Sequence, residues 1–177
     1  MGTIRDEIRQ TKPFESAAEE AVVTLLGTAD RVRTALSRVT DAHDVTLQQY
    51  NVLRILRGAG PDGLPTLDIA ARMIEHSPGI TRLLDRLEAR SLVRRLRCPD
   101  DRRQVLCHAT EKARRLLADL DGPVAEAGRR SLAPLDAPRT ADLVRLLDTV
   151  RAAAASSPTI DSNRKKNHKK TKKETRT

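Results

Sequence analysis

The sequence changes its hydrophobic period near residue 91, and this change restricts the folds that the chain can adopt. Before it, residues 78–90 carry apolar side chains at the i, i+3, i+4, i+7 spacing of one helix face, at Ile80, Leu83, Leu84 and Leu87. After it, residues 92–98 and 104–109 have the pattern of two strands, with residues 99–103 as the turn between them. An amphipathic helix followed at once by a charged hairpin predicts a helix with a β-wing.

A second short helix is predicted over residues 67–75, where Thr66 can serve as the cap. Its expected apolar contacts are Leu67, Ile69, Ala70, Met73 and Ile74. Ser77 and Pro78 then suit the start of the next helix, because the N–H that proline lacks has no partner at the first helical position. Two helices that meet across a short turn, each with one apolar face, form the helix-turn-helix pattern.

Longer helical stretches flank this winged helix-turn-helix, which spans about residues 46–110 within a domain of residues 14–155. The N-terminal helix covers about residues 15–43. The C-terminal helical region covers about residues 111–155, and Gly122-Pro123 is expected to kink or break it. The expected fold class is therefore mainly α with a small β-wing.

Both ends of the chain lack an apolar helical period. Residues 1–13 are polar and end at a proline, so we expect a flexible arm. Residues 156–177 are rich in lysine, and from residue 161 onward they hold eight Lys and Arg against two acidic residues, so we expect a disordered basic tail. Because the tail carries most of the net charge of +9, that charge says little about the partner of the folded part.

Composition excludes several classes of protein. One Tyr, one Phe and no Trp argue against a protein that stacks single-stranded bases on aromatic rings. The sequence has no apolar run of membrane-spanning length and no segment of signal-peptide type, and two cysteines make no disulfide framework, so we expect a cytoplasmic protein that does not enter membranes. No catalytic or phosphate-cradling motif appears, so we expect no enzyme activity, cofactor or metal.

The polar face of the helix at 78–90 is the candidate binding surface. A helix docked in the major groove of DNA by its N-terminal half would present Pro78, Gly79, Thr81, Arg82 and Arg86. Arginines at the wing tip, Arg102 and Arg103, can enter the minor groove, where the negative potential is focused. The alternatives are a solvated helix face with a local ion pair at Asp85, and a plain charged turn.

The segments Ser77–Glu88, Leu92-Val93 and Asp101-Arg102-Arg103 resemble the MarR family of winged-helix regulators. The resemblance covers roughly residues 15–155 in the order of elements and is strongest over residues 47–110. It implies a homodimer with interlocking N- and C-terminal helices, which reads a palindromic site on double-stranded DNA. It also implies major-groove contacts, a minor-groove contact at Arg103 and a salt bridge at Asp101 that braces the wing. The predicted DNA-binding residues are Thr66, Ser77, Pro78, Gly79, Thr81, Arg82, Arg86, Arg102 and Arg103.

The resemblance further implies release from DNA by a small phenolic or other apolar ligand that lodges between the dimer helices and the winged lobe. Residues in plausible places for such a pocket are Val39, His43, Tyr50 and Asn51. The chain departs from the family at Ser91, where glycine is usual, so we expect a strained left-handed turn there. A redox role for the wing cysteines, Cys98 and Cys107, is disfavoured because free cysteines are most often small buried apolar groups. A metal site formed by them with His108 is disfavoured because the spacing is not that of a zinc motif.

Three functions remain open at this point. The favoured one is a sequence-specific, homodimeric repressor of a palindromic operator, released by a small molecule. The second is a nonspecific nucleic-acid binder driven by the basic tail. The third is a helical interaction module that does not read DNA.

Overall fold

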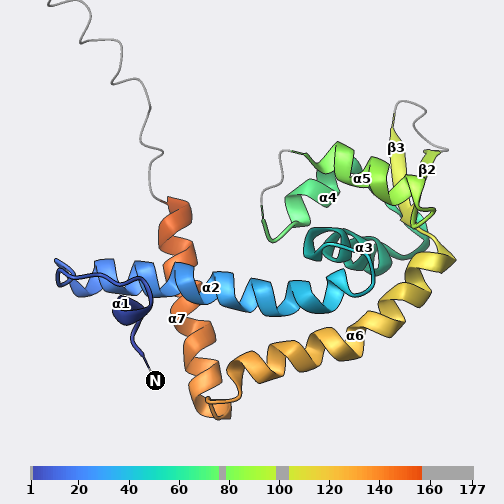
Figure 1. The fold of residues 1–177 in the computed structure, drawn as a ribbon. Helices are drawn as coiled ribbons and strands as arrows, with labels where there is room; N and C mark the ends of the chain where they lie inside the picture. Colours follow the sequence, from blue (N-terminus) through green and yellow to red (C-terminus); the bar gives the residue numbers. More distant parts are fainter. Residues whose placement is uncertain (1, 76–78, 99–103, 157–177) are drawn as a thin grey trace, which may run out of the picture. The chain divides into compact units, whose positions relative to one another are not determined.

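The computed structural model describes residues 2–75, 79–98 and 104–156 (Figure 1). In chain order its elements are α1 Ile4–Glu7, α2 Ala17–Asp41, α3 Leu47–Ala59, the 3-10 helix η1 Gly60–Asp62, β1 Leu64–Pro65, α4 Thr66–Arg72, α5 Ile80–Ala89, β2 Val93–Arg97, β3 Val105–Ala109, α6 Glu111–Leu132 and α7 Ala137–Ser156. The expected fold class, mainly α with a small β-wing, is confirmed. The chain forms two compact units, Met1–Ala133 and Pro134–Thr177, and each is described by itself.

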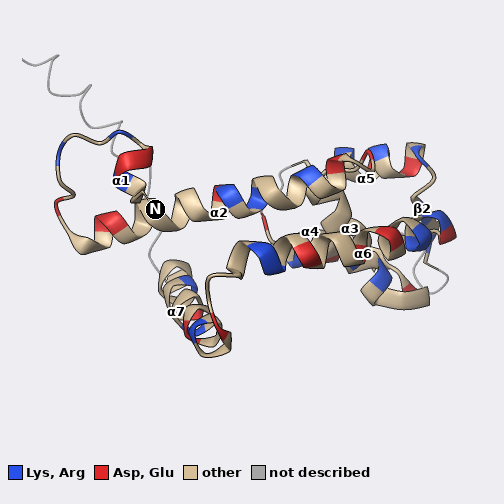
Figure 2. Cartoon of the chain, turned by 60° about the horizontal axis from the view of Figure 1, so that its bottom comes forward, with Lys and Arg blue, Asp and Glu red and all other residues tan. Residues whose placement is uncertain are grey.

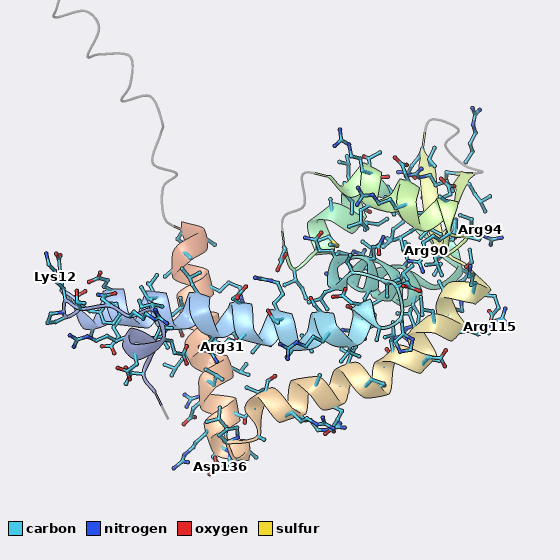
Figure 3. The ribbon with its side chains drawn as sticks, viewed as in Figure 1. Lys12, Arg31, Arg90, Arg94, Arg115 and Asp136 are labelled. Atoms are coloured by element: carbon cyan, nitrogen blue, oxygen red, sulfur yellow. The ribbon has the colours of Figure 1, made fainter. Side chains whose placement is uncertain are left out.

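A one-turn helix, α1, lies within the segment expected as a flexible arm. The Thr3 side chain caps it by accepting from the amide of Asp6, and the Asp6 carboxylate accepts from the amide of Thr3. The helix packs on α2, where Ile4 contacts Gly27, and its Glu7 pairs with Arg31 at 2.7 Å. Arg31 is labelled in Figure 3. These contacts are long-range, which explains why a local hydrophobic pattern did not indicate a helix.

The core of the first unit lies between α3, α4, α5, the sheet and the first half of α6. Helix α3 begins with a capping box, since the Thr46 side chain accepts from the amide of Gln49 and the Gln49 side chain accepts from the amide of Thr46. Helix α2 packs against α3 and lies beside α6. The largest fully buried aliphatic side chains come from all these elements: Leu53, Leu56, Ile69, Leu84, Leu87, Leu92, Leu117 and Leu120.

Helix α4 is shorter than its sequence pattern predicts. Thr66 is its first residue rather than its side-chain cap, and the backbone turns extended at Met73, where the helix ends. Met73 is still buried, but Leu67 is 80% exposed and Ile74 is 85% exposed, so the expectation that both pack in the core is wrong. Leu67 stands two positions before Ile69, about 200° around the helix, and Ile74 falls beyond the helix end.

The sheet has three antiparallel strands in the order β1-β3-β2. The predicted hairpin is confirmed, with Val93 opposite Ala109 and Arg97 opposite Val105. The third strand, β1, pairs with β3 through Leu64 opposite Cys107. A two-residue strand carries no readable alternation, so its partner is set by tertiary packing.

The sequence predicts a kink or a break at Gly122-Pro123, and α6 continues through this proline without a break. Leu117 and Leu120 are buried before the proline, and Val124 packs against the same core after it. Packing on both sides of the proline thus offsets the one backbone hydrogen bond that it removes. In the second unit, α7 has no buried residue. Among the described residues, no helix is long and apolar enough to cross a membrane.

Candidate nucleic-acid interface

Helix α5 divides sharply into a buried and an exposed face. Leu83, Leu84 and Leu87 are buried, as their spacing predicted. The opposite face is exposed and carries Thr81, Arg82, Asp85, Arg86 and Ala89, and Figure 2 shows basic and acidic positions alternating along the helix. We call Thr81, Arg82 and Arg86 the reading face. These side chains share one solvent-facing surface, as an interaction with DNA requires.

The start of α5 is only partly described. The helix begins at Ile80, and Gly79 occupies the N-cap position without a side-chain hydrogen bond. The predicted cap Ser77 and the predicted first residue Pro78 lie outside the described residues. Thr66, also a predicted DNA contact, opens α4 and is half-buried.

Arg82 and Arg86 have no carboxylate partner among the residues that the structure describes. The local ion pair considered from the sequence would have tied Asp85 to one of them. Instead, Asp85 accepts a hydrogen bond from Arg95 of β2 at 2.7 Å. Two guanidinium groups on the reading face are therefore available for another anion.

Arg95 is a residue that the sequence analysis missed. The same nitrogen that contacts Asp85, Nη1, also donates to Glu88 at 2.8 Å, and the side chain is only 24% exposed. Burial works to lower the pKa of Arg95, but hydrogen bonds to Asp85 and Cys107 and the charge of Glu88 outweigh it, so the pKa is raised. The available signal was strand alternation, which puts every second residue of β2 on the side of the sheet that faces α5.

The wing is described up to its tip. The amide of Cys98 donates to the carbonyl of Gln104 at 2.9 Å and continues the hairpin beyond the paired strands. The three predicted tip residues lie outside the described residues: Asp101, Arg102 and Arg103. Their roles in DNA contact and wing bracing therefore stay predictions.

The turn between α5 and β2 has the predicted left-handed backbone. Ser91 has a φ of 58°, a conformation that costs a non-glycine residue about 1–2 kcal/mol. Its amide donates to Glu88, and its carbonyl accepts from the Thr110 hydroxyl at 2.8 Å. The amide of Leu92 closes the helix end on Leu87. The turn connects α5, which carries the reading face, directly to the first strand of the wing.

A cavity of about 460 Å³ opens beside α5. Its lining comes from α2, the N-terminal turn of α3, the segment after α4, and α5, and includes Arg33, Gln48, Met73, Glu75, Arg82 and Arg86. The Glu75 carboxylate accepts from Arg33 at 2.7 Å and from Gln48 at 3.3 Å. The hydrogen bond from Arg33 above all, and then that from Gln48, lowers the pKa of Glu75.

The four residues expected around a ligand pocket do not line this cavity. Tyr50 is buried and its hydroxyl donates to Asp121 at 3.4 Å, whereas Asn51 donates to the Met73 sulfur at 3.7 Å. Val39 packs against the core, and His43 is partly buried near the end of α2. Within the described ranges, no group of three His, Cys, Asp or Glu residues could hold a metal ion.

The comparisons with known proteins agree on one family. The MarR family model matches residues 45–105. A MarR transcription factor from Planctomyces limnophilus, known from a crystal structure, is 39% identical with a TM-score of 0.60, and the match covers 77% of this chain and 99% of that one.

Two curated relatives extend this result. The HTH-type transcriptional regulator TtmR of Methylorubrum extorquens is 35% identical over 117 residues, which are 65% of this chain and 59% of that protein. The chain thus spans less than two thirds of that relative. The homoprotocatechuate degradative operon repressor of Escherichia coli is 26% identical over 130 residues, covering 73% of this chain and 86% of the repressor.

Proposed function

The chain belongs to the MarR family of transcriptional regulators, whose members are transcription factors rather than enzymes, and from this premise we propose that it is a homodimeric repressor that binds a palindromic operator. The single observation that carries the proposal is the reading face of α5. Two arginines without a carboxylate partner among the described residues stand on one exposed helix face, directly before a β-hairpin. Arginine can grip guanine with two hydrogen bonds in the major groove, and a threonine methyl can contact thymine.

Exposed apolar side chains on two helices support the homodimer. In the first unit, α2 exposes Val22 and Leu26, at 55% and 65%. In the second unit, α7 exposes Val144, Leu146 and Val150. Such apolar helix surfaces are stabilised by covering them, and a second copy of the same chain would do so with twofold symmetry. Two copies carry two reading faces, which suits a palindromic site.

The name of the Escherichia coli relative supports repression, and the cavity beside α5 supports a response to a small molecule. Three arginines and one glutamate line the cavity together with Met73, Ile74 and Leu83. This lining favours a ligand with an apolar body and an acidic group over a purely apolar one. Because the lining includes Arg82 and Arg86, such a ligand would contact the reading face itself.

The deciding experiment compares two single variants on a DNA site selected from genomic fragments. Arg82→Ala and Arg86→Ala should each weaken binding by roughly tenfold to a hundredfold in gel-shift titrations, while circular dichroism stays unchanged. Arg129→Ala serves as the control, since Arg129 is exposed on α6 and pairs locally with Glu126. Wild-type affinity in either reading-face variant would remove the assignment.

The two other functions have tests of their own. Deletion of residues 161–177 should cause only a modest, salt-sensitive loss of binding, whereas a nonspecific binder driven by the tail would lose all of it. An interaction module would form the dimer in a sizing experiment and leave a DNA titration flat. The exposed, cationic reading face favours the repressor over that module.

A further inference from the structure

Among the described residues of the wing, Arg95 alone forms salt bridges with side chains of α5. Its guanidinium lies between Asp85 and Glu88, at 2.7 and 2.8 Å, and its second nitrogen reaches the Thr81 carbonyl at 3.5 Å. Asp85 stands on the same exposed face as Arg82, three residues further along the helix. Residues at this spacing are neighbours on a helix surface, so an unpaired Asp85 would pair with Arg82.

Whether Asp85 pairs with Arg95 or with Arg82 should affect DNA binding. DNA binding gains from each cation that neutralises a phosphate, and a free carboxylate on the docking face both repels phosphate and occupies an arginine. Arg95 removes this problem because its side chain is partly buried, at 24% exposure, and already oriented, whereas Asp85 and Arg82 are both exposed. The partly buried partner therefore holds the carboxylate more effectively than the exposed one.

We propose that Arg95 is a positioning residue that neutralises Asp85 and Glu88 and so keeps Arg82 and Arg86 available for DNA. Arg95 acts through these two carboxylates and needs no contact with DNA. The contact also couples the wing to α5, because Arg95 is paired in the sheet opposite Cys107 of β3. This inference rests on the proposed DNA-binding function.

Charge neutralisation and simple bracing of the wing predict different outcomes. Arg95→Gln should weaken operator binding roughly tenfold or more, and the slope of log affinity against log salt should fall by about one, since one cation is lost to Asp85. The triple variant Arg95→Gln/Asp85→Asn/Glu88→Gln should recover to within about threefold of the wild type, because neutral amides no longer compete for Arg82. With a bracing role alone, the triple variant would bind as weakly as Arg95→Gln, and this result would overturn the proposal.

Arg94→Gln is the matched control. Arg94 is adjacent on β2, is exposed, and has no carboxylate partner among the described residues (Figure 3). The Arg94→Gln variant carries the same change of net charge as Arg95→Gln and should leave the slope at the wild-type value. The double variant Asp85→Asn/Glu88→Gln, with Arg95 intact, tests the proposal even if Arg95→Gln does not fold. It should bind at least as tightly as the wild type, and weaker binding would show that the carboxylates are needed as a brace.

A measurement without DNA separates this inference from the function on which it rests. Side-chain NMR of ¹⁵N-labelled arginines reads whether the Arg82 guanidinium becomes ordered by a carboxylate. Ordering should appear in Arg95→Gln and disappear in the triple variant. A wild-type protein that fails to bind any selected site would contradict the proposed function, whereas an unchanged Arg82 signal in Arg95→Gln would contradict the role of Arg95.

Discussion

Two positive-φ residues within the winged lobe show how single positions decide its geometry. Gly63 has a φ of 68° and leads from η1 into β1, and Ser91 has a φ of 58° and leads from α5 into β2. Glycine takes this conformation without steric cost, and serine does not. Both turns thus need a positive φ, which Gly63 adopts without strain and Ser91 with strain.

Replacement of Gly63 by alanine should destabilise the fold strongly. A Cβ at this position would lie 2.5 Å from Cε1 of His108 and 2.8 Å from the carbonyl oxygen of Cys107, in addition to the backbone cost. We expect a loss of about 1–3 kcal/mol in the free energy of unfolding, measured by urea denaturation. Gly58→Ala is the control, because Gly58 lies in α3 with no atom near its Cβ and should gain up to about 1 kcal/mol. Equal stability of the two variants would contradict this account.

Replacement of Ser91 by glycine should instead increase the free energy of unfolding. The Ser91 side chain is exposed, and its backbone contacts to Glu88 and Thr110 do not need the hydroxyl. Relief of the left-handed strain exceeds the entropy that glycine adds to the unfolded chain, so we expect a gain of about 0.5–1 kcal/mol. Ser91→Ala tests the hydroxyl separately and should be neutral. A destabilised glycine variant in thermal or urea unfolding would show that the turn is not strained.

At the scale of elements, α3 and α6 are joined by a polar clamp on the outside of the core. Asp121 of α6 accepts from Arg57 of α3 at 2.6 and 3.2 Å, and also from the Tyr50 hydroxyl. The hydrogen bond from Arg57 is the main reason that the pKa of Asp121 is lowered. Asp121 directly follows the buried Leu120 and lies about one turn after the buried Leu117, so the clamp joins α3 to α6 next to the core.

The clamp should make stability depend on pH in the acid range. A lowered pKa in the folded state means that Asp121 stabilises the fold above its unfolded pKa, and that this contribution is lost as pH falls through the folded value. At pH 7, Asp121→Asn should cost about 0.5–1 kcal/mol, since the side chain is 43% exposed. The difference from the wild type should shrink between about pH 5 and pH 2 in urea unfolding. Asp119→Asn controls for net charge, and a pH-independent difference at Asp121 would refute the clamp.

At the scale of the whole molecule, the proposed homodimer would cover the exposed apolar surface of α2. Leu26→Glu should convert the dimer to a monomer of half the mass in sedimentation equilibrium, because a charge would be buried without a partner. Leu67→Glu is the control, since Leu67 is 80% exposed on α4, outside the helices expected to dimerise. Loss of the dimer should also weaken operator binding, since each reading face would then bind alone. A dimer that persists in Leu26→Glu would place the interface elsewhere.

The sequence predicted most of the winged lobe because its signals are local. Leu83, Leu84 and Leu87 lie within one helix, and the hairpin lies within one stretch of chain, so spacing alone indicated which faces are buried. The Thr46 cap and the left-handed turn at Ser91 were also readable, because both depend on residues a few positions apart.

Four features depended on contacts between segments distant in sequence. Helix α1 forms on α2, β1 pairs with β3, and α6 passes Pro123 because packing lies on both sides of it. The cavity is lined by residues from four segments, and none of the four residues expected around a ligand pocket is among them. The partners of charged side chains also depend on which distant segments the fold brings together.

The reading face on α5 was therefore determined by the sequence itself, since a helix period places Thr81, Arg82 and Arg86 together wherever the helix lies. Only the tertiary structure decided which of its charges are free. Arg95 comes from a different element and takes Asp85, so the arginines of the reading face keep no partner within the described chain. The physical reason is that periodicity fixes the direction of a side chain, whereas the partner of a charge depends on which element the fold brings against it.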